Sequence, residues 1–300
     1  MTRIQANLVL LLAAAIWGGG FVAQSTAMDN IGPFWFVGLR FAIAAIAVLP
    51  FALMETRKMK SAPSRGEIRA FMLVGLALFM GATTQQVGLL TTTVTNSSFL
   101  TALYVIFVPV IAVVLYRRHP HWVVWPGALM MLGGIFLLSG GAINQLTTGD
   151  TLSIICAFFW AIQITLAGRF VMQSNRPLAL SCTQFAVCAG LSMLIGVFIE
   201  PINTAAIASS LTEIIYVGLV SSGLAFVLQV VAQRYTTAPQ AAIFLSSEAL
   251  FGALFASIFL QETIPAAGYV GCAIIFAAIL LVELVPEISK RRNSRLAAEI

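Results

Sequence analysis

Long runs of apolar residues follow one another along the whole chain, separated by short stretches that carry charges, prolines or glycines. Each run is close to the roughly 20 residues that a helix needs to cross a bilayer. The runs do not alternate apolar and polar positions as the strands of a membrane barrel do. They therefore predict an all-α integral membrane protein with ten transmembrane helices, at residues 5–25, 33–54, 69–90, 94–115, 121–140, 148–168, 177–199, 209–231, 237–259 and 264–284.

The charged residues give these predicted helices an orientation. With the N-terminus inside, all 16 Lys and Arg residues except Arg40 fall on the cytoplasmic side or at the cytoplasmic ends of the spans. The opposite loops carry the acids Asp29, Asp150, Glu200 and Glu262. Because Lys and Arg are enriched in cytoplasmic loops, we expect both the N- and the C-terminus to be cytoplasmic.

Composition supports the membrane assignment and narrows the function. The chain is 60% hydrophobic and only 9% charged, whereas soluble domains have about 25% charged residues. The membrane topology accounts for the net charge of +5, so we expect no nucleic-acid partner. The four cysteines lie in apolar runs without a CxxC spacing, so we expect no disulfide, metal or other cofactor.

The second half of the chain repeats the first at a spacing of 144 residues. The segment PFWFVGLRFAIAA at 33–45 matches PLALSCTQFAVCA at 177–189, and Gln85 matches Gln229. We therefore expect two five-helix repeats, residues 1–144 and 145–300, which together form one transmembrane domain. An odd number of helices in each repeat makes the second repeat enter the membrane from the opposite side. Inverted repeats of this kind are typical of secondary transporters.

Two ionisable residues lie inside predicted spans, which makes them candidates for function because charge is costly in a membrane. Arg40 is near enough to a helix end for its side chain to extend to the membrane surface, and this interfacial role is the alternative to a function in transport. Glu248 lies near the centre of its span, where structural hydrogen bonding to a neighbouring helix is the alternative. Both are therefore predicted as charge-coupling or structural residues.

Further polar and aromatic residues recur at helical spacing on six of the predicted helices. Each one could simply hold two helices together, but as a set they predict an amphipathic cavity. Such a cavity suits a ligand with a large apolar body and one polar end, such as an amino acid with a large side chain or a drug. The predicted path residues are Trp17, Gln24, Gln85, Asn96, Tyr104, Trp160, Gln163, Ser222, Gln229, Phe244 and Glu248.

Several motifs resemble the EamA units of the drug/metabolite transporter superfamily. They are the WGGGF of the first helix, the P-x6-R-F run from Pro33 to Phe41, VPVIAVVL in the fourth helix, and QETIPAAGYVGCAIIFAAILL from Gln261. The resemblance implies a ten-helix carrier that exports metabolites or amino acids from bacteria without an ATPase subunit. The chain departs from the pattern at Arg117-Arg118, and at Gln184, which replaces the arginine of the first repeat.

The sequence thus predicts a multi-pass secondary transporter of the bacterial inner membrane that works by alternating access. We expect it to export small amphipathic metabolites, above all amino acids with large or aromatic side chains. Its expected partners are that substrate and the lipid bilayer, and its oligomeric state stays open. A proton-coupled drug/metabolite antiporter is the alternative. A membrane-embedded enzyme or a scaffold is less favoured, since His119 and His121 lack an acidic partner at catalytic spacing.

Overall fold

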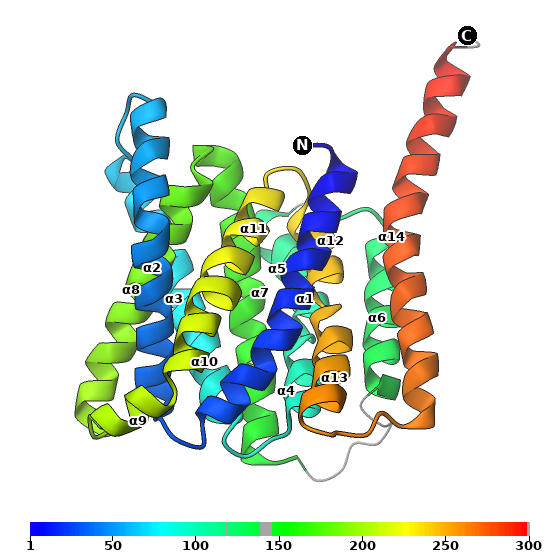
Figure 1. Ribbon diagram of the computed structural model, residues 1–300. Helices are drawn as coiled ribbons and strands as arrows, with labels where there is room; N and C mark the ends of the chain where they lie inside the picture. Colours follow the sequence, from blue (N-terminus) through cyan, green and yellow to red (C-terminus); the bar gives the residue numbers. More distant parts are fainter. Residues whose placement is uncertain (118, 139–145, 299–300) are drawn as a thin grey trace.

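The computed structural model describes residues 1–117, 119–138 and 146–298, and the described chain is helical throughout (Figure 1). The first repeat comprises α1 (Arg3–Ala27), α2 (Pro33–Lys58), α3 (Arg65–Gly88), α4 (Val94–Thr101), α5 (Tyr104–Tyr116) and α6 (Val124–Leu138). The second comprises α7 (Thr148–Ser174), α8 (Pro177–Ile199), α9 (Thr204–Ser209), α10 (Leu211–Tyr216), η1 (Val217–Leu224), α11 (Ala225–Ala232), α12 (Ala238–Leu245), α13 (Glu248–Phe259) and α14 (Ala266–Ala298).

The predicted membrane helices are present. In the described part of the chain, nine helical stretches are long and apolar enough to span a bilayer. The remaining predicted span, 121–140, is a shorter apolar helix of 15 residues, α6, and residues 139 and 140 lie outside the described part. The short helix α9, between α8 and α10, was not expected. The prediction of a ten-helix membrane protein is confirmed, with a short fifth helix.

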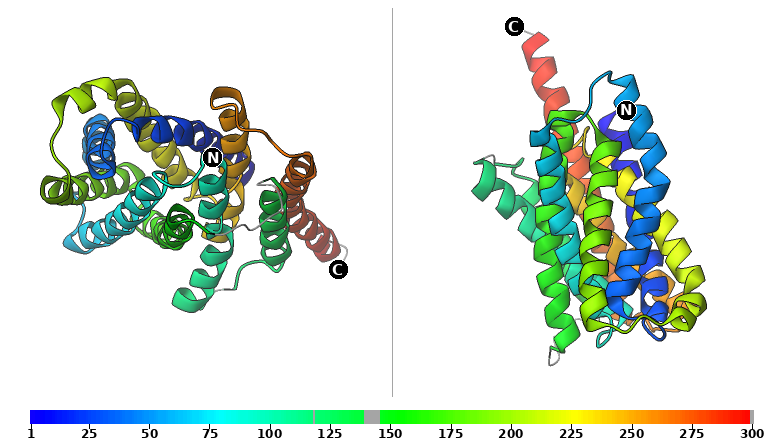
Figure 2. Two further views of the ribbon diagram at one scale, coloured as in Figure 1. Left: turned by 90° about the horizontal axis from the view of Figure 1, so that it is seen from below. Right: turned by 90° about the vertical axis from the view of Figure 1, so that its left-hand side faces the viewer.

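The two repeats run through the bundle in opposite senses. The chain begins at the end of the bundle beyond which α14 also projects, whereas α7 begins the second repeat at the opposite end (Figure 1). We call the end that holds the N-terminus inner and the other end outer. α2 packs along α8 at one edge of the bundle, and α6 packs along α14 at the opposite edge (Figure 2). Each edge therefore pairs equivalent helices of the two repeats.

Reciprocal carboxylate caps hold the α2·α8 pair together at both membrane surfaces. At the outer end, Glu200 accepts the backbone N–H groups of residues 34 and 35 at 3.0 and 3.1 Å. At the inner end, Glu55 accepts those of residues 178 and 179 at 3.1 and 2.9 Å. Residues 34 and 178 are 144 positions apart, and so are residues 35 and 179. The two caps therefore lie at equivalent positions of the two repeats. A carboxylate at a helix N-terminus satisfies free N–H groups and the helix dipole.

Glycines let the helices approach closely. A methyl group on Gly134 of α6 would lie 2.8 Å from the carbonyl oxygen of Gly271 on α14. In the WGGGF motif, a methyl group on Gly18 would lie 2.7 Å from the backbone nitrogen of Gly252 on α13. Helix association in a membrane depends on such close packing. The glycines of α6 and α14 therefore form a contact within the chain.

Candidate functional site

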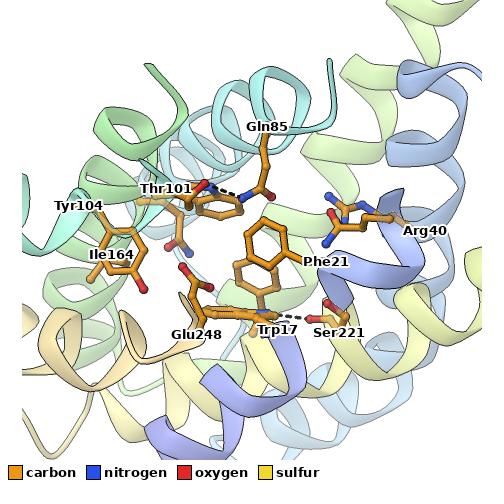
Figure 3. Close-up of a pocket in the computed structure, with 13 residues that line it drawn as sticks. Trp17, Phe21, Arg40, Gln85, Thr101, Tyr104, Ile164, Ser221 and Glu248 are labelled. Atoms are coloured by element: carbon orange, nitrogen blue, oxygen red, sulfur yellow. Dashed lines mark hydrogen bonds between the residues drawn. The ribbon is translucent and has the colours of Figure 1, made fainter. Parts of the chain in front are cut away.

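A cavity lies between the helices near the middle of the bundle, and Figure 3 shows the side chains that line it. Its walls come from α1, α2, α3, α4, α5, α7, η1, α11 and α13. The lining residues are Trp17, Phe21, Gln24, Arg40, Gln85, Thr101, Tyr104, Trp160, Gln163, Ile164, Ser221, Phe226 and Glu248. Both repeats thus contribute to one mostly apolar space with a few polar groups, which is the usual composition of a small-molecule site.

Two helix interruptions at equivalent positions place polar groups in this cavity. α4 ends at Thr101 and α5 begins at Tyr104, while α12 ends at Leu245 and α13 begins at Glu248. In both places the backbone tightens through bonds between residues three apart, such as Val105 N to Ala102 O at 3.0 Å. Tyr104 and Glu248 directly follow the interruptions and are 144 residues apart. Discontinuous helices at the repeat interface are typical of transporter binding sites.

The third helix of the second repeat contains a π-helical segment, η1, whereas its counterpart α3 is regular. π-helical turns are rare and occur frequently at functional sites. Here the wide turn brings Ser221 to the cavity wall, and its backbone carbonyl accepts a hydrogen bond from Trp17 Nε1 at 2.9 Å. This segment therefore fixes the orientation of one tryptophan of the cavity.

Aromatic rings form most of the apolar wall. Phe226 packs against Trp17 with ring centroids 4.7 Å apart and stacks on Trp160 at 5.5 Å. Gly81 of α3 makes room for Trp160, since a methyl group there would lie 3.2 Å from the indole ring. Trp17 and Trp160, which match in the repeat, thus flank a common phenylalanine and provide a flat apolar surface.

Arg40 is buried at the outer part of the cavity, with 3% of its surface exposed. Its Nη1 donates a hydrogen bond to Gln24 Oε1 at 2.7 Å. The guanidinium also lies over the ring of Phe41, 4.9 Å from the centroid, and 5.6 Å from that of Phe36. Arg40 therefore does not extend to the membrane surface, so the interfacial alternative does not apply to it.

Glu248 is equally buried, with 4% of its surface exposed. The hydroxyl of Tyr104 points toward its carboxylate across the cavity (Figure 3). Its Oε1 atom has no hydrogen-bond partner among the residues that the structure describes. A buried carboxylate without a cationic partner is costly, so Glu248 can offer an unsatisfied oxygen to a polar group of a ligand.

A network of four buried glutamines lies on the inner side of the cavity and joins α7, α8 and α11. Gln163 Nε2 donates to Gln184 at 3.0 Å, and Gln229 Nε2 donates to Gln163 at 3.1 Å. Gln233 Nε2 bonds the carbonyl oxygen of Ile164 at 2.9 Å. Most of this network ties helices together, as interhelical amide groups do in membranes, and Gln163 alone also faces the cavity.

The structure brings most of the sequence-predicted residues into one cavity: Trp17, Gln24, Arg40, Gln85, Tyr104, Trp160, Gln163 and Glu248. Four predicted residues do not line it. Asn96 lies in the first turn of α4 at the outer end, and Gln229 belongs to the glutamine network. Phe244 lies just before the α12–α13 interruption, and its side chain is buried in the core instead of facing the cavity. Ser222 is fully buried beside Ser221, because the π-helical turn presents the earlier serine.

The sequence interpretation missed five lining residues: Phe21, Thr101, Ile164, Ser221 and Phe226. Phe21 and Ile164 follow the two tryptophans by four residues, so helical spacing from Trp17 and Trp160 would have found them. Thr101 and Ser221 lie at irregular backbone that the sequence does not indicate. Within the described residues, no three His, Cys, Asp or Glu side chains come together as a metal site would require.

The two halves of the chain, residues 4–140 and 147–284, each match the profile of the EamA-like transporter family. The chain belongs to the EamA-like transporter family. This membership confirms the resemblance of its motifs to that family and its assignment as a transporter rather than an enzyme.

Relatives of this EamA-like transporter carry the same general description. An uncharacterized transporter of Archaeoglobus fulgidus is 32% identical over 285 residues, which cover 94% of this chain and 87% of the relative. An uncharacterized transporter of Bacillus subtilis is 24% identical over 293 residues and 95% of each chain. A crystal structure with 17% identity superimposes with a TM-score of 0.77 over 95% of this chain and 99% of its own, which shows the same fold.

Proposed function

We propose that this EamA-like transporter exports small amphipathic metabolites, foremost amino acids with large or aromatic side chains. The observation that carries the proposal is the cavity between the two repeats near the middle of the bundle. Its wall combines the rings of Trp17, Trp160 and Phe226 with the buried polar ends of Arg40 and Glu248. Aromatic surfaces hold an apolar body and a few placed polar groups orient it. We propose the cytoplasmic membrane of a bacterial cell as its location.

The packing of the helices favours alternating access, in which two equivalent groups of helices rock around a central site. α3, α4 and α5 pack against α7, and the inverted counterpart has α10 to α13 packing against α1. Each group thus combines helices three and four of one repeat with helix one of the other. Rocking of such groups around a fixed central site is how inverted-repeat transporters expose it to either side.

Polar contacts join the two groups on both sides of the cavity. Two of them lie at the ends of the helices: Thr95 of α4 donates to Glu262 beyond α13, and Arg234 beyond α11 donates to Asn175 at the end of α7. On the outer side, Gln86 Nε2 of α3 donates to the carbonyl oxygen of Gln24 on α1 at 3.1 Å. On the inner side, Gln229 of α11 donates to Gln163 of α7, and Gln233 to the backbone of α7. In the proposed cycle, the outer contacts break to release substrate outward and the inner contacts break to admit it from the cytoplasm.

A proteoliposome assay with the purified full-length protein tests the proposal. We expect flux of phenylalanine, tyrosine, tryptophan, methionine or leucine above that of empty liposomes, with threonine slower. Trp17→Ala and Trp160→Ala are expected to lower the flux or to change the order of substrates while the protein remains folded and inserted. Absence of flux for every amino acid would refute the proposed substrate class, and wild-type kinetics in both variants would refute the cavity assignment.

Proton-coupled antiport is the second candidate, and the burial of Glu248 with a partnerless oxygen favours it. A carboxyl group in such a place can exchange a proton for a substrate cation. In that case an imposed pH gradient changes the flux, and Glu248→Gln abolishes the effect of the gradient. Equal flux with and without the gradient in the wild-type protein would leave facilitated diffusion as the mechanism.

A further inference from the structure

Two buried ionisable groups, the base Arg40 and the acid Glu248, line the cavity without pairing with each other. Neither Arg40 nor Glu248 forms an ion pair with any residue that the structure describes. Arg40 Nε and Glu248 Oε1 have no hydrogen-bond partner among those residues, although both side chains are more than nine-tenths buried. A cationic donor and an anionic acceptor are thus both available to one ligand.

The two groups lie on different walls, with aromatic rings between them. Figure 3 shows Arg40 on one side of the cavity and Glu248 on the other, with Phe21 and Trp17 in between. They also differ in depth. At a rise of about 1.5 Å per residue, Arg40 lies about 10 Å and Glu248 about 17 Å from the outer ends of α2 and α13. A ligand that touches both must therefore extend along an apolar path.

Arg40 is positioned to bind a carboxylate. Its Nη1 donates to Gln24, and the face of the guanidinium lies over the ring of Phe41. The edge that carries Nε is therefore left to bind a ligand. Guanidinium edges bind carboxylates through paired, charge-assisted hydrogen bonds. The carboxylate of Glu248, beside the ring of Tyr104, offers the complementary surroundings for an ammonium or guanidinium group (Figure 3).

An ordinary α-amino acid can engage only one of these two groups at a time, because its ammonium and carboxylate share one carbon. We propose that the cavity selects zwitterions whose anionic and cationic ends are separated by an apolar spacer, with Arg40 holding the anion and Glu248 the cation. This chemical class comprises ω-amino acids and amino acids with a cationic end to a long side chain. The inference rests on the proposed function and narrows its substrates.

Two isomers test the inference directly, because norleucine and ε-aminocaproate differ only in the position of the amino group. Transport of each is measured with the purified full-length protein in proteoliposomes, with lysine and phenylalanine as further substrates. Hydrogen bonds to charged groups predict that kcat/KM is about tenfold to a hundredfold higher for ε-aminocaproate than for norleucine. Lysine is expected to exceed norleucine in the same way.

Variants of Arg40 and Glu248 distinguish a role in substrate selection from a purely structural role. Glu248→Gln should bring the ratio of the two isomers close to one, and Glu248→Asp should restore part of it. Arg40→Gln, which copies the equivalent Gln184 of the second repeat, should raise the KM for both isomers, because both carry the carboxylate. Quenching of the cavity tryptophans on titration with ε-aminocaproate provides a binding measurement that does not depend on flux.

Failure of this inference can be told apart from failure of the proposed function. If norleucine and phenylalanine are transported at least as well as ε-aminocaproate and lysine, the separated-charge inference is wrong and the proposed function stands. A Glu248→Gln variant that slows both isomers by the same factor would also overturn it. If none of the four compounds moves in liposomes that contain folded protein, the proposed function is wrong as well.

Discussion

Two adjacent glycines of α6 provide a sharp test of how this bundle is held together. A methyl group added to Gly134 would lie 2.8 Å from the carbonyl oxygen of Gly271 and 3.0 Å from the backbone nitrogen of Ile275, both on α14. A methyl group added to Gly133 would meet nothing within 4 Å. Gly134→Ala therefore has to move two helix backbones apart, whereas Gly133→Ala fills open space.

The expected difference follows from two opposing effects. Replacing glycine by alanine inside a helix stabilises it by about 0.5–1 kcal/mol, and this gain applies equally to both positions. Forcing extra atoms into a packed contact costs about 1–3 kcal/mol, and this cost applies only to Gly134. Gly134→Ala should accordingly be about 1–3 kcal/mol less stable than Gly133→Ala, a difference from which the helix-propensity term cancels.

Reversible unfolding in lipid–detergent micelles, titrated with SDS and followed by tryptophan fluorescence, measures this difference. Gly271→Ala on the partner helix should be destabilised in the same direction as Gly134→Ala, since its methyl group meets the backbone of α6. Equal free energies of unfolding for Gly133→Ala and Gly134→Ala would refute the packing of α6 on α14. So would a destabilised Gly133→Ala beside an unaffected Gly134→Ala.

Two further pairs of variants test the caps and the proposed contacts on either side of the cavity. Glu55→Ala and Glu200→Ala should each lower the free energy of unfolding by about 1–2 kcal/mol, because each leaves two helix N–H groups without their acceptor. The same SDS titration measures both losses, which should be similar in size. A wild-type free energy of unfolding for either variant would contradict the cap. Gln86→Leu should expose the cavity to the outer side, and Gln229→Leu to the cytoplasmic side. A single reporter cysteine at Thr101 in a cysteine-free background, labelled by an impermeant thiol reagent from each side, measures these shifts, and identical labelling in both variants would contradict them.

The positions of the helices could be predicted because their physical causes are local. Apolar length determines where a segment spans the bilayer, and proline at the first helical position marks where α2 and α8 begin, at Pro33 and Pro177. Trp17 and Trp160 lie 143 residues apart, one fewer than the repeat spacing, and the structure places both against Phe226. Helical periodicity together with the repeat was thus sufficient to bring most of the predicted residues into one cavity.

The departures from regular helix could not be predicted in the same way. Residues 94–115 and 237–259 are continuous apolar runs with no glycine or proline at 102–103 or 246–247, where the helices are interrupted. The backbone compensates there with bonds between residues three apart, which leaves no pattern in the sequence. Regular helical spacing therefore puts Phe244 on the cavity face with Glu248. In the same way it favours Ser222 over Ser221, because the sequence does not indicate the π-helical turn of η1.

The repeat is symmetric in its scaffold and asymmetric in its charges, and this difference has a functional consequence. Arg40 corresponds to Gln184 in the second repeat, and Glu248 corresponds to Tyr104 in the first. Two arginines or two glutamates at equivalent positions would place like charges in one buried region, where repulsion is poorly screened. One charge of each sign, each with a neutral counterpart, avoids that repulsion and gives the cavity a fixed direction. In the proposed cycle, we expect the inverted helices to rock equivalently toward either side while a ligand with distinct ends keeps one orientation.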